Sequence, residues 1–207
     1  MTITLYHHPF SRASGTVWML EEVGVPYALH YVDIRTGEQK QPELLALNPM
    51  GKLPTLTDGD VVVTEAAAIG LYLADRYALG KLAPPTDDPR RGPYLRWSLF
   101  PANVIEPGLM AKAGGWQYRE SAAGWGSHAA MLETMKRALS HDYVLGDTFS
   151  MADVIFGGTL RYMLRVNLLQ PDPVFSAYVE RLSARPALQR ADAINASVAK
   201  ERGLTPG

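Results

Sequence analysis

The chain has 207 residues and a mass of 22.7 kDa, a length that fits one large domain or two small ones. Apolar residues make up 47% of the chain and charged residues 20%, so a buried core is expected and disorder is not. The 20 Lys and Arg residues nearly balance the 21 Asp and Glu residues, and the net charge of −1 gives no reason to expect nucleic acid or an anionic membrane as a partner.

Cysteine is absent, which excludes disulfides, Cys-ligated zinc and a catalytic thiol belonging to the protein itself. No apolar run approaches the ~20 residues that a membrane span needs. The first residues, Met1 to Thr4, show neither the basic region nor the long apolar region of a secretory signal. We therefore expect a soluble, cytoplasmic protein.

Strand and helix patterns alternate along the first part of the chain. Strand patterns, rich in β-branched and aromatic residues, occupy residues 2–6, 27–34, 53–57 and 61–63. Helix patterns lie near residues 17–23, 42–47 and 65–77. Asp58-Gly59-Asp60 predicts a hairpin turn between the last two strands. This order predicts an α/β domain, a mixed sheet with helices packed on it.

The second part of the chain shows only helical patterns. Residues 82–89 are rich in Pro and Asp and are typical of a linker. After this linker, helix patterns occupy residues 94–111, 129–139, 150–167, 174–184 and 187–200. Ser150 and Asp153 have the spacing of a capping box at the start of one of these helices. We therefore expect an all-α second domain.

Several segments, in this order along the chain, resemble the glutathione S-transferase superfamily, in particular its bacterial, serine-type members. The segments are Leu5-Tyr6-His7-His8-Pro9-Phe10-Ser11-Arg12 with Trp18-Met19-Leu20-Glu21-Glu22, Gly37 to Glu43, Asn48-Pro49-Met50-Gly51-Lys52-Leu53-Pro54-Thr55-Leu56, Thr64-Glu65-Ala66-Ala67-Ala68-Ile69, and Gly146-Asp147 through Asp153. The resemblance implies a thioredoxin-like, glutathione-binding domain with a mixed four-stranded sheet at residues 1–79. It also implies a linker at 80–89 and an all-α domain at 90–207.

Ser11 is the expected catalytic residue. From its position alone, a serine before a helix is a cap whose hydroxyl accepts from a backbone N–H. The resemblance implies that it donates to the glutathione sulfur and holds it as a thiolate. Tyr6 and Ser14 are the alternatives, although Tyr6 fits a packed strand residue and Ser14 an ordinary helix-start residue. Arg12 is either an electrostatic aid to the thiolate or a solvated surface cation.

The resemblance also implies where glutathione binds. Gln39, Lys40 and Lys52 match positions that hold the glycine carboxylate, and the backbone of Leu53, before a cis Pro54, pairs with the cysteinyl part. Two further residues belong to the γ-glutamyl end, the acidic Glu65 and its neighbour Ala66. Ala66 departs from the family, which usually has Ser or Thr there, so one hydroxyl donor is missing.

The resemblance implies a homodimeric transferase that adds the glutathione thiolate to small hydrophobic electrophiles, with glutathione as co-substrate and no metal. Adjacent His7 and His8 do not predict a metal site, because neighbouring strand residues point to opposite faces. Two alternatives stay open, a non-catalytic binding or regulatory protein with this fold, and a glutathione-dependent peroxidase or disulfide reductase. A reductase that uses a cysteine of its own is excluded.

Overall fold

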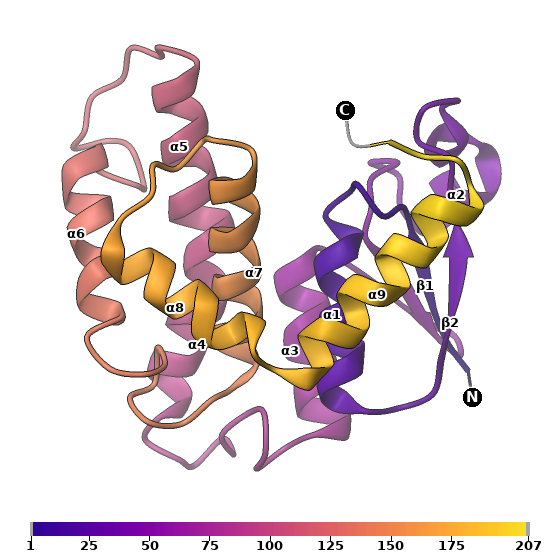
Figure 1. Ribbon diagram of the computed structural model, residues 1–207, viewed down its shortest axis with the longest axis horizontal. Helices are drawn as coiled ribbons and strands as arrows, with labels where there is room; N and C mark the ends of the chain where they lie inside the picture. Colours follow the sequence, from indigo (N-terminus) through magenta and orange to yellow (C-terminus); the bar gives the residue numbers. More distant parts are fainter. Residues whose placement is uncertain (1, 206–207) are drawn as a thin grey trace. The chain divides into compact units, whose positions relative to one another are not determined.

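The computed structural model describes residues 2–205, which form two compact units (Figure 1). One unit contains the chain up to Ala78 together with the segment that begins at Arg185. The other unit is Leu79–Ala184. None of the helices within residues 2–205 is both long and apolar enough to cross a membrane.

The first unit is built around a four-stranded mixed sheet. Its strands are β1 (Ile3–His7), β2 (Tyr27–Tyr31), β3 (Thr55–Asp58) and β4 (Val61–Thr64), in the spatial order β2-β1-β3-β4. Strand β1 runs parallel to β2 and antiparallel to β3, and β3 forms an antiparallel hairpin with β4. The expected α/β fold with its mixed sheet is confirmed.

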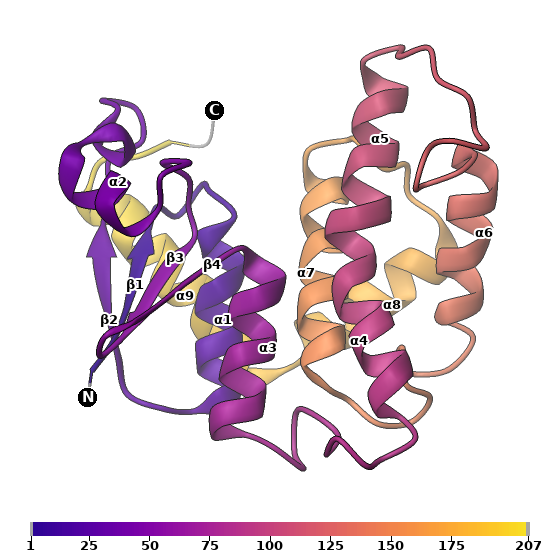
Figure 2. The ribbon, with the colours of Figure 1, turned by 180° about the vertical axis from the view of Figure 1, so that it is seen from behind.

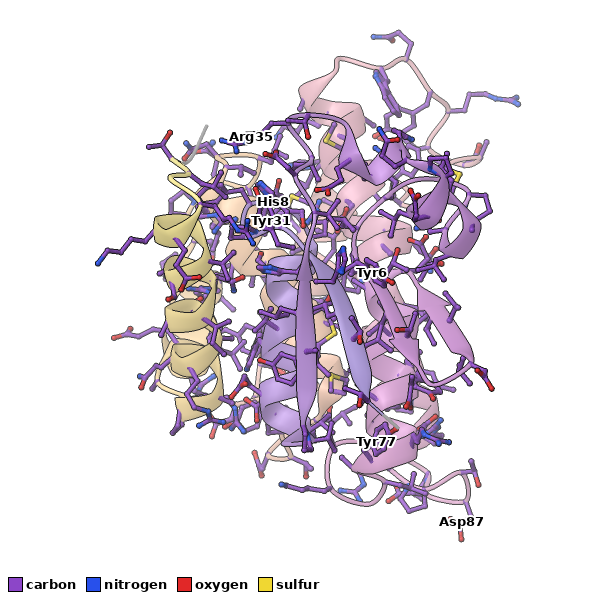
Figure 3. All side chains as sticks on the ribbon, turned by 90° about the vertical axis from the view of Figure 1, so that its right-hand side faces the viewer. Tyr6, His8, Tyr31, Arg35, Tyr77 and Asp87 are labelled. Carbon is purple, nitrogen blue, oxygen red and sulfur yellow. The ribbon has the colours of Figure 1, made fainter. Side chains whose placement is uncertain are left out.

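Two helices cover one face of this sheet. They are α1 (Ala13–Val23) and α3 (Ala66–Tyr77), which lie side by side behind the strands in Figure 3. A 3₁₀ turn, η1 (Glu38–Lys40), and the short helix α2 (Pro42–Leu47) lie between β2 and β3 along the chain. Alternate side chains of β1 are buried, as expected for a strand with one face on the core.

The last helix, α9 (Pro186–Glu201), packs against α1 in the first unit. The sequence analysis assigned all of residues 90–207 to one helical domain, so this part of the chain needs correction. The physical reason is a pair of charged contacts. Arg185 donates two hydrogen bonds to the carboxylate of Glu22 (2.6 and 2.8 Å), and Arg190 donates to the carboxylate of Glu21 (2.6 Å).

Two expected strands have different bounds in the structure. The strand expected at 27–34 ends at Tyr31, because Asp33 begins a turn in which its carbonyl accepts from the backbone N–H of Glu38 (3.1 Å). The strand expected at 53–57 begins only at Thr55 and extends to Asp58. Residues 53 and 54 therefore precede the strand instead of pairing within it.

The second unit is entirely helical, as expected. Its helices are α4 (Arg91–Phe100), the π-helical segment η2 (Pro101–Ile105), α5 (Glu106–Ala113), α6 (His128–Ala138), α7 (Met151–Arg165) and α8 (Pro173–Ser183). The single helix expected at 94–111 is thus interrupted by η2, which begins at Pro101, a residue without the N–H that a regular helix needs. Figure 2 shows α4 and α5 as one nearly continuous column beside α7.

Helix α7 organises the core of this unit. The expected capping box is present, with the Asp153 carboxylate accepting from the backbone N–H of Ser150 (2.9 Å). The same buried carboxylate accepts from the Tyr178 hydroxyl of α8 (2.9 Å). A Cβ on Gly157 would lie 2.1 Å from Cδ1 of Leu182, so only glycine permits this close approach of α7 and α8.

Candidate functional site

One end of the sheet collects the segments that the resemblance assigns to glutathione. Tyr6 pairs with Thr55, so the loop after β1 and the segment before β3 lie at the same end. Thr55 also pairs with Thr64, so the start of α3 reaches that end as well. Figure 3 shows this region with Tyr6, His8 and Tyr31 labelled. Three segments that are distant in sequence are therefore neighbours.

The Ser11 hydroxyl lies at the start of α1 and already makes two hydrogen bonds. It donates to the carbonyl of His8 (2.9 Å) and accepts from the backbone N–H of Ala13 (3.1 Å), the first residue of α1, although the N-cap position itself is Arg12. The backbone N–H of Ser11 donates to the same His8 carbonyl at 3.0 Å. Because that carbonyl keeps a second donor, the hydroxyl can turn toward another acceptor without leaving the carbonyl unpaired.

The two alternative hydroxyls have other surroundings. The Ser14 hydroxyl donates to the carbonyl of Ser11 (2.9 Å) inside the first turn of α1. The Tyr6 ring packs against His30, with ring centroids 4.8 Å apart, among β1 residues that alternate away from the buried side. Ser11 is thus the hydroxyl of the three that belongs to the loop itself.

His8 shapes the loop that carries Ser11, and the sequence analysis gave it no such role. Its ring is buried, and Nδ1 accepts from the backbone N–H of Phe10 (3.2 Å). The ring also packs against Phe10 and Tyr31 at centroid distances of 6.0 and 5.7 Å. Burial lowers the pKa of His8, so the neutral ring with an acceptor at Nδ1 is favoured.

Asn195 of α9 joins the two sides of the same loop. Its Oδ1 lies 2.7 Å from Nε2 of His7, the last residue of β1, and its Nδ2 donates to the carbonyl of Ser14 in α1 (3.2 Å). The amide also donates to the carbonyl of Ala191 within α9 (2.9 Å). Because Asn195 lies far from the loop in sequence, no local pattern could have indicated this contact.

The segment before β3 presents unpaired backbone groups. The Leu53–Pro54 peptide bond is cis, as the resemblance implies. Within residues 2–205, the backbone N–H and C=O of Leu53 have no hydrogen-bond partner. The Lys52 side chain is exposed. Its backbone carbonyl accepts a hydrogen bond from Nδ2 of the buried Asn48 (3.0 Å). Asn48 therefore supports this segment, a role that the sequence analysis did not assign to it.

Gln39 and Lys40 lie against the same segment. A Cβ on Gly51 would lie 2.8 Å from the carbonyl oxygen of Gln39, so the two stretches of backbone nearly touch. Gly51 has φ of 54°, a conformation that favours glycine. The Lys40 ammonium donates to the carbonyl of Met50 (2.8 Å), and the side-chain oxygen of Gln39 is buried without a partner in the described chain. The Lys40 ammonium and the Gln39 backbone therefore lie against Met50 and Gly51, the residues that precede Lys52 and Leu53 in the chain.

Glu65 and Ala66 form the start of α3. Glu65 is exposed and has φ of 67° and ψ of 121°, a sparsely populated conformation for a residue other than glycine. Such strain costs about 1–3 kcal/mol and is concentrated at ligand-binding positions. The side chain of Glu65 makes no capping bond, so the first N–H groups of α3 remain available.

The site as a whole is suited to a peptide-like anion. The N-termini of α1 and α3 both follow strands at this end of the sheet and carry partial positive charge. Lys40 and Lys52 add full charges, whereas Arg35 is neutralised by Asp33 (2.9 Å), whose pKa it lowers to about 2. Residues 2–205 contain no group of three or more His, Asp or Glu side chains that could hold a metal ion.

Comparisons with known proteins agree with this arrangement. Residues 1–75 match the family model for the N-terminal domain of glutathione S-transferases. The chain is 29% identical to glutathione S-transferase F10 of Arabidopsis thaliana over 93% of its own length and 97% of the relative's. It is 32% identical to glutathione S-transferase 1 of Schizosaccharomyces pombe over 68% of its length and 66% of the relative's.

A solved structure extends the likeness to the whole fold. A glutathione transferase from Methylococcus capsulatus str. Bath has a TM-score of 0.78 and 27% identity, covering 95% of this chain and all of that one. The curated relatives above come from a plant and a yeast, so they do not assign the chain to a bacterial or serine-type subclass. Sequence, family model and fold together show that the chain belongs to the glutathione S-transferase superfamily.

Proposed function

We propose that the protein is a serine-type glutathione transferase, which adds the glutathione thiolate to small hydrophobic electrophiles. The observation that carries the proposal is the Ser11 hydroxyl at the N-terminus of α1, bonded to a His8 carbonyl that has a second donor. This hydroxyl can therefore turn to the sulfur of bound glutathione at little cost in hydrogen bonding.

The energetics fit the task. A hydrogen bond to a charged group contributes about 1.5–3 kcal/mol, and one pKa unit corresponds to about 1.36 kcal/mol. One hydroxyl can thus lower a thiol pKa of about 8.5 by one to two units. The partial positive charge at the start of α1 acts in the same direction.

The remaining candidate residues would bind the rest of glutathione. Lys40, Lys52 and Gln39 would hold the glycine carboxylate. The free N–H and C=O of Leu53 would pair with the cysteinyl backbone, an arrangement supported by the absence of other partners in the described chain. The N–H groups at Ala66 would receive the γ-glutamyl carboxylate, and Glu65 would face the ammonium group.

The test replaces the proposed hydroxyl and each rival hydroxyl in turn. Ser11→Ala should lower kcat/KM with an aromatic electrophile about tenfold, less than loss of an oxyanion-hole donor, because hydrogen bonds to sulfur are weaker. It should also raise the pKa in the pH profile of kcat/KM, while the Kd for glutathione stays within about twofold. Ser14→Ala and Tyr6→Phe serve as matched controls and should leave that pKa unchanged. Full activity in Ser11→Ala together with loss in Tyr6→Phe would overturn the assignment.

A second candidate is a non-catalytic protein that retains the fold, and Ala66 is the observation that favours it. Without the usual Ser or Thr hydroxyl, the γ-glutamyl carboxylate has one donor fewer. Retention on immobilised glutathione, followed by elution with free glutathione, separates the candidates. A chain that is not retained and shows no turnover would support the non-catalytic function.

A further inference from the structure

Residues 8–11 form a tight turn between β1 and α1. The backbone N–H of Ser11 donates to the carbonyl of His8 (3.0 Å), the hydrogen bond that closes a four-residue turn. Pro9 occupies the second position of this turn, where its fixed φ is favoured. The Ser11 hydroxyl donates to the same carbonyl (2.9 Å), so the place of this hydroxyl depends on the geometry of the turn.

The His8 side chain makes a second hydrogen bond within the turn. Its Nδ1 accepts from the backbone N–H of Phe10, two residues further along the chain (3.2 Å), as an Asn or Asp side chain does in an Asx turn. Among residues 2–205, the Phe10 N–H has no other partner. Without the ring nitrogen this N–H would be unpaired in a partly buried loop, which would favour other conformations of the turn.

The surroundings of the His8 ring hold it in one orientation. The ring is buried and lies against the rings of Phe10 and Tyr31, and Figure 3 labels His8 and Tyr31 at the same end of the sheet. The guanidinium of Arg202, at the end of α9, lies 4.5 Å from the centre of the Tyr31 ring. Because Phe10 donates to Nδ1, the neutral ring carries its proton on Nε2, a buried atom without a partner in the described chain. The ring's hydrogen bond to the protein is therefore the one that it makes to the turn.

We propose that His8 is a positioning residue for the transferase reaction, whose Nδ1 holds the turn that directs the Ser11 hydroxyl toward the glutathione sulfur. This inference rests on the proposed role of Ser11, because His8 acts only through that hydroxyl. A displacement of about 1 Å at a catalytic group can cost up to ~10²-fold in rate, so a bond that fixes the turn affects the reaction without touching the substrate.

Two substitutions of His8 test the proposal in the full chain. Leu has no acceptor, whereas the side-chain oxygen of Asn can accept from the N–H two residues further on. We expect His8→Leu to raise the pKa of the bound glutathione thiol by about one unit, measured by the ultraviolet absorbance of the thiolate, and to lower kcat/KM about threefold to tenfold. His8→Asn should keep kcat/KM within about twofold of the native value. His141→Leu, at an exposed residue of the second unit, should change neither quantity.

Binding of S-methylglutathione, which has no thiol, separates positioning from damage to the site. His8→Leu should bind it with a Kd within about twofold of the native value, because the contacts of the peptide backbone and carboxylates do not involve Ser11. A Kd raised about tenfold or more would mean that His8 supports the whole site, and would overturn the proposal.

Nitrogen NMR of the native chain with bound glutathione adds a check that needs no variant. The His8 ring should carry its proton on Nε2 and none on Nδ1. A His8 ring protonated at Nδ1 in this complex would overturn the proposal, because Nδ1 could not then accept from Phe10.

A double variant distinguishes failure of this inference from failure of the proposed function. In a Ser11→Ala background, His8→Leu should lower kcat/KM by less than about twofold further, because the hydroxyl that it positions is gone. An equal loss in both backgrounds, or a thiol pKa that Ser11→Ala raises and His8→Leu does not, would overturn the role of His8 alone. A thiol pKa unchanged in Ser11→Ala would overturn the proposed function, and this inference with it.

Discussion

Ala66 occupies the first position of α3, where one more hydrogen-bond donor can reach a bound carboxylate. We expect Ala66→Ser to lower the Kd for glutathione by threefold to tenfold, measured by titration calorimetry. The upper limit corresponds to a charged hydrogen bond of ~1.5 kcal/mol. Competing water and the lower helix propensity of serine reduce the gain.

Ala68→Ser is the matched control, because Ala68 lies in the same first turn and is exposed. It should leave the Kd for glutathione unchanged, and neither variant should alter which electrophiles react. If Ala66→Ser leaves the affinity unchanged or weakens it, the start of α3 does not hold the γ-glutamyl group. The assignment of Glu65 and Ala66 to glutathione would then be abandoned.

His7 predicts a pH dependence of stability. It is fully buried, and burial lowers its pKa below 6.5 despite the hydrogen bond to Asn195. As the pH falls through 6.5, His7 becomes protonated in the unfolded chain but stays neutral in the folded chain. The free energy of unfolding therefore decreases toward acid pH. The loss from this one group approaches about 1.4 kcal/mol per pH unit.

Urea titrations between pH 7.5 and 5.5 measure this effect. His8 and His128 also have lowered pKa values and contribute to the slope of the native protein. His7→Gln removes one of these groups, so its slope of unfolding free energy against pH should be shallower. His141, an exposed residue, provides the control, since His141→Gln should reproduce the native slope. Equal slopes in the His7→Gln variant and the native chain would contradict the prediction.

From the sequence, the role of a single residue could be predicted only where the residue lies within a recognisable motif. The position of Ser11 before α1 predicts only a helix cap, and its catalytic role stays a prediction that rests on the family resemblance. The cis bond at Pro54, which the same resemblance implies, is present. His8 and Asn48 act through backbone groups of neighbouring residues. These hydrogen bonds depend on the path of the loop backbone, which cannot be predicted from composition or periodicity.

At the scale of elements, α9 determines how the loop around Ser11 is held. Asn195 is the contact through which α9 reaches both β1 and α1. We expect Asn195→Ala to lower the free energy of unfolding by about 1–3 kcal/mol, because it leaves the buried His7 ring with no partner on either nitrogen. Urea denaturation measures the change.

Lys200→Ala, an exposed substitution in the same helix, is the control and should change stability by less than about 0.5 kcal/mol. If Asn195→Ala is no more destabilising than this control, the contact between α9 and the loop contributes nothing to stability. The helical pattern of α9 could be predicted, but its location could not. The ion pairs of Arg185 and Arg190 with α1 join residues that are distant in sequence.

At the scale of the whole molecule, we expect a homodimer of about twice 22.7 kDa. The superfamily resemblance motivates this expectation, and β4 adds a physical reason. It is an edge strand whose Val61 and Val62 side chains are 44% and 41% exposed. Apolar edge strands that are not covered favour association with another chain. Sedimentation velocity in dilute solution should give the dimer mass.

A charged residue introduced into β4 tests whether this edge strand contributes to the dimer interface. Val62→Lys should shift the sedimentation profile toward monomer, whereas Val166→Lys, a similarly exposed valine of the second unit, should not. Monomer mass for the native chain at all concentrations would contradict the expectation. The order of strands and the helical second unit could be predicted from pattern, but the exposure of β4 depends on the final register of the sheet.

Because the chain is synthesised from its N-terminus, the position of α9 at the end of the sequence affects how the first unit forms during translation. All strands of the sheet and every proposed glutathione contact are synthesised before Leu79, but the helix that covers α1 emerges only after residues 79–184. At ~5–20 residues per second, that interval lasts roughly 5–20 s. During this time the nascent first unit has an uncovered α1 and a Ser11 loop without Asn195. A prematurely terminated chain would retain these defects permanently, so completion of the proposed active site is tied to completion of translation.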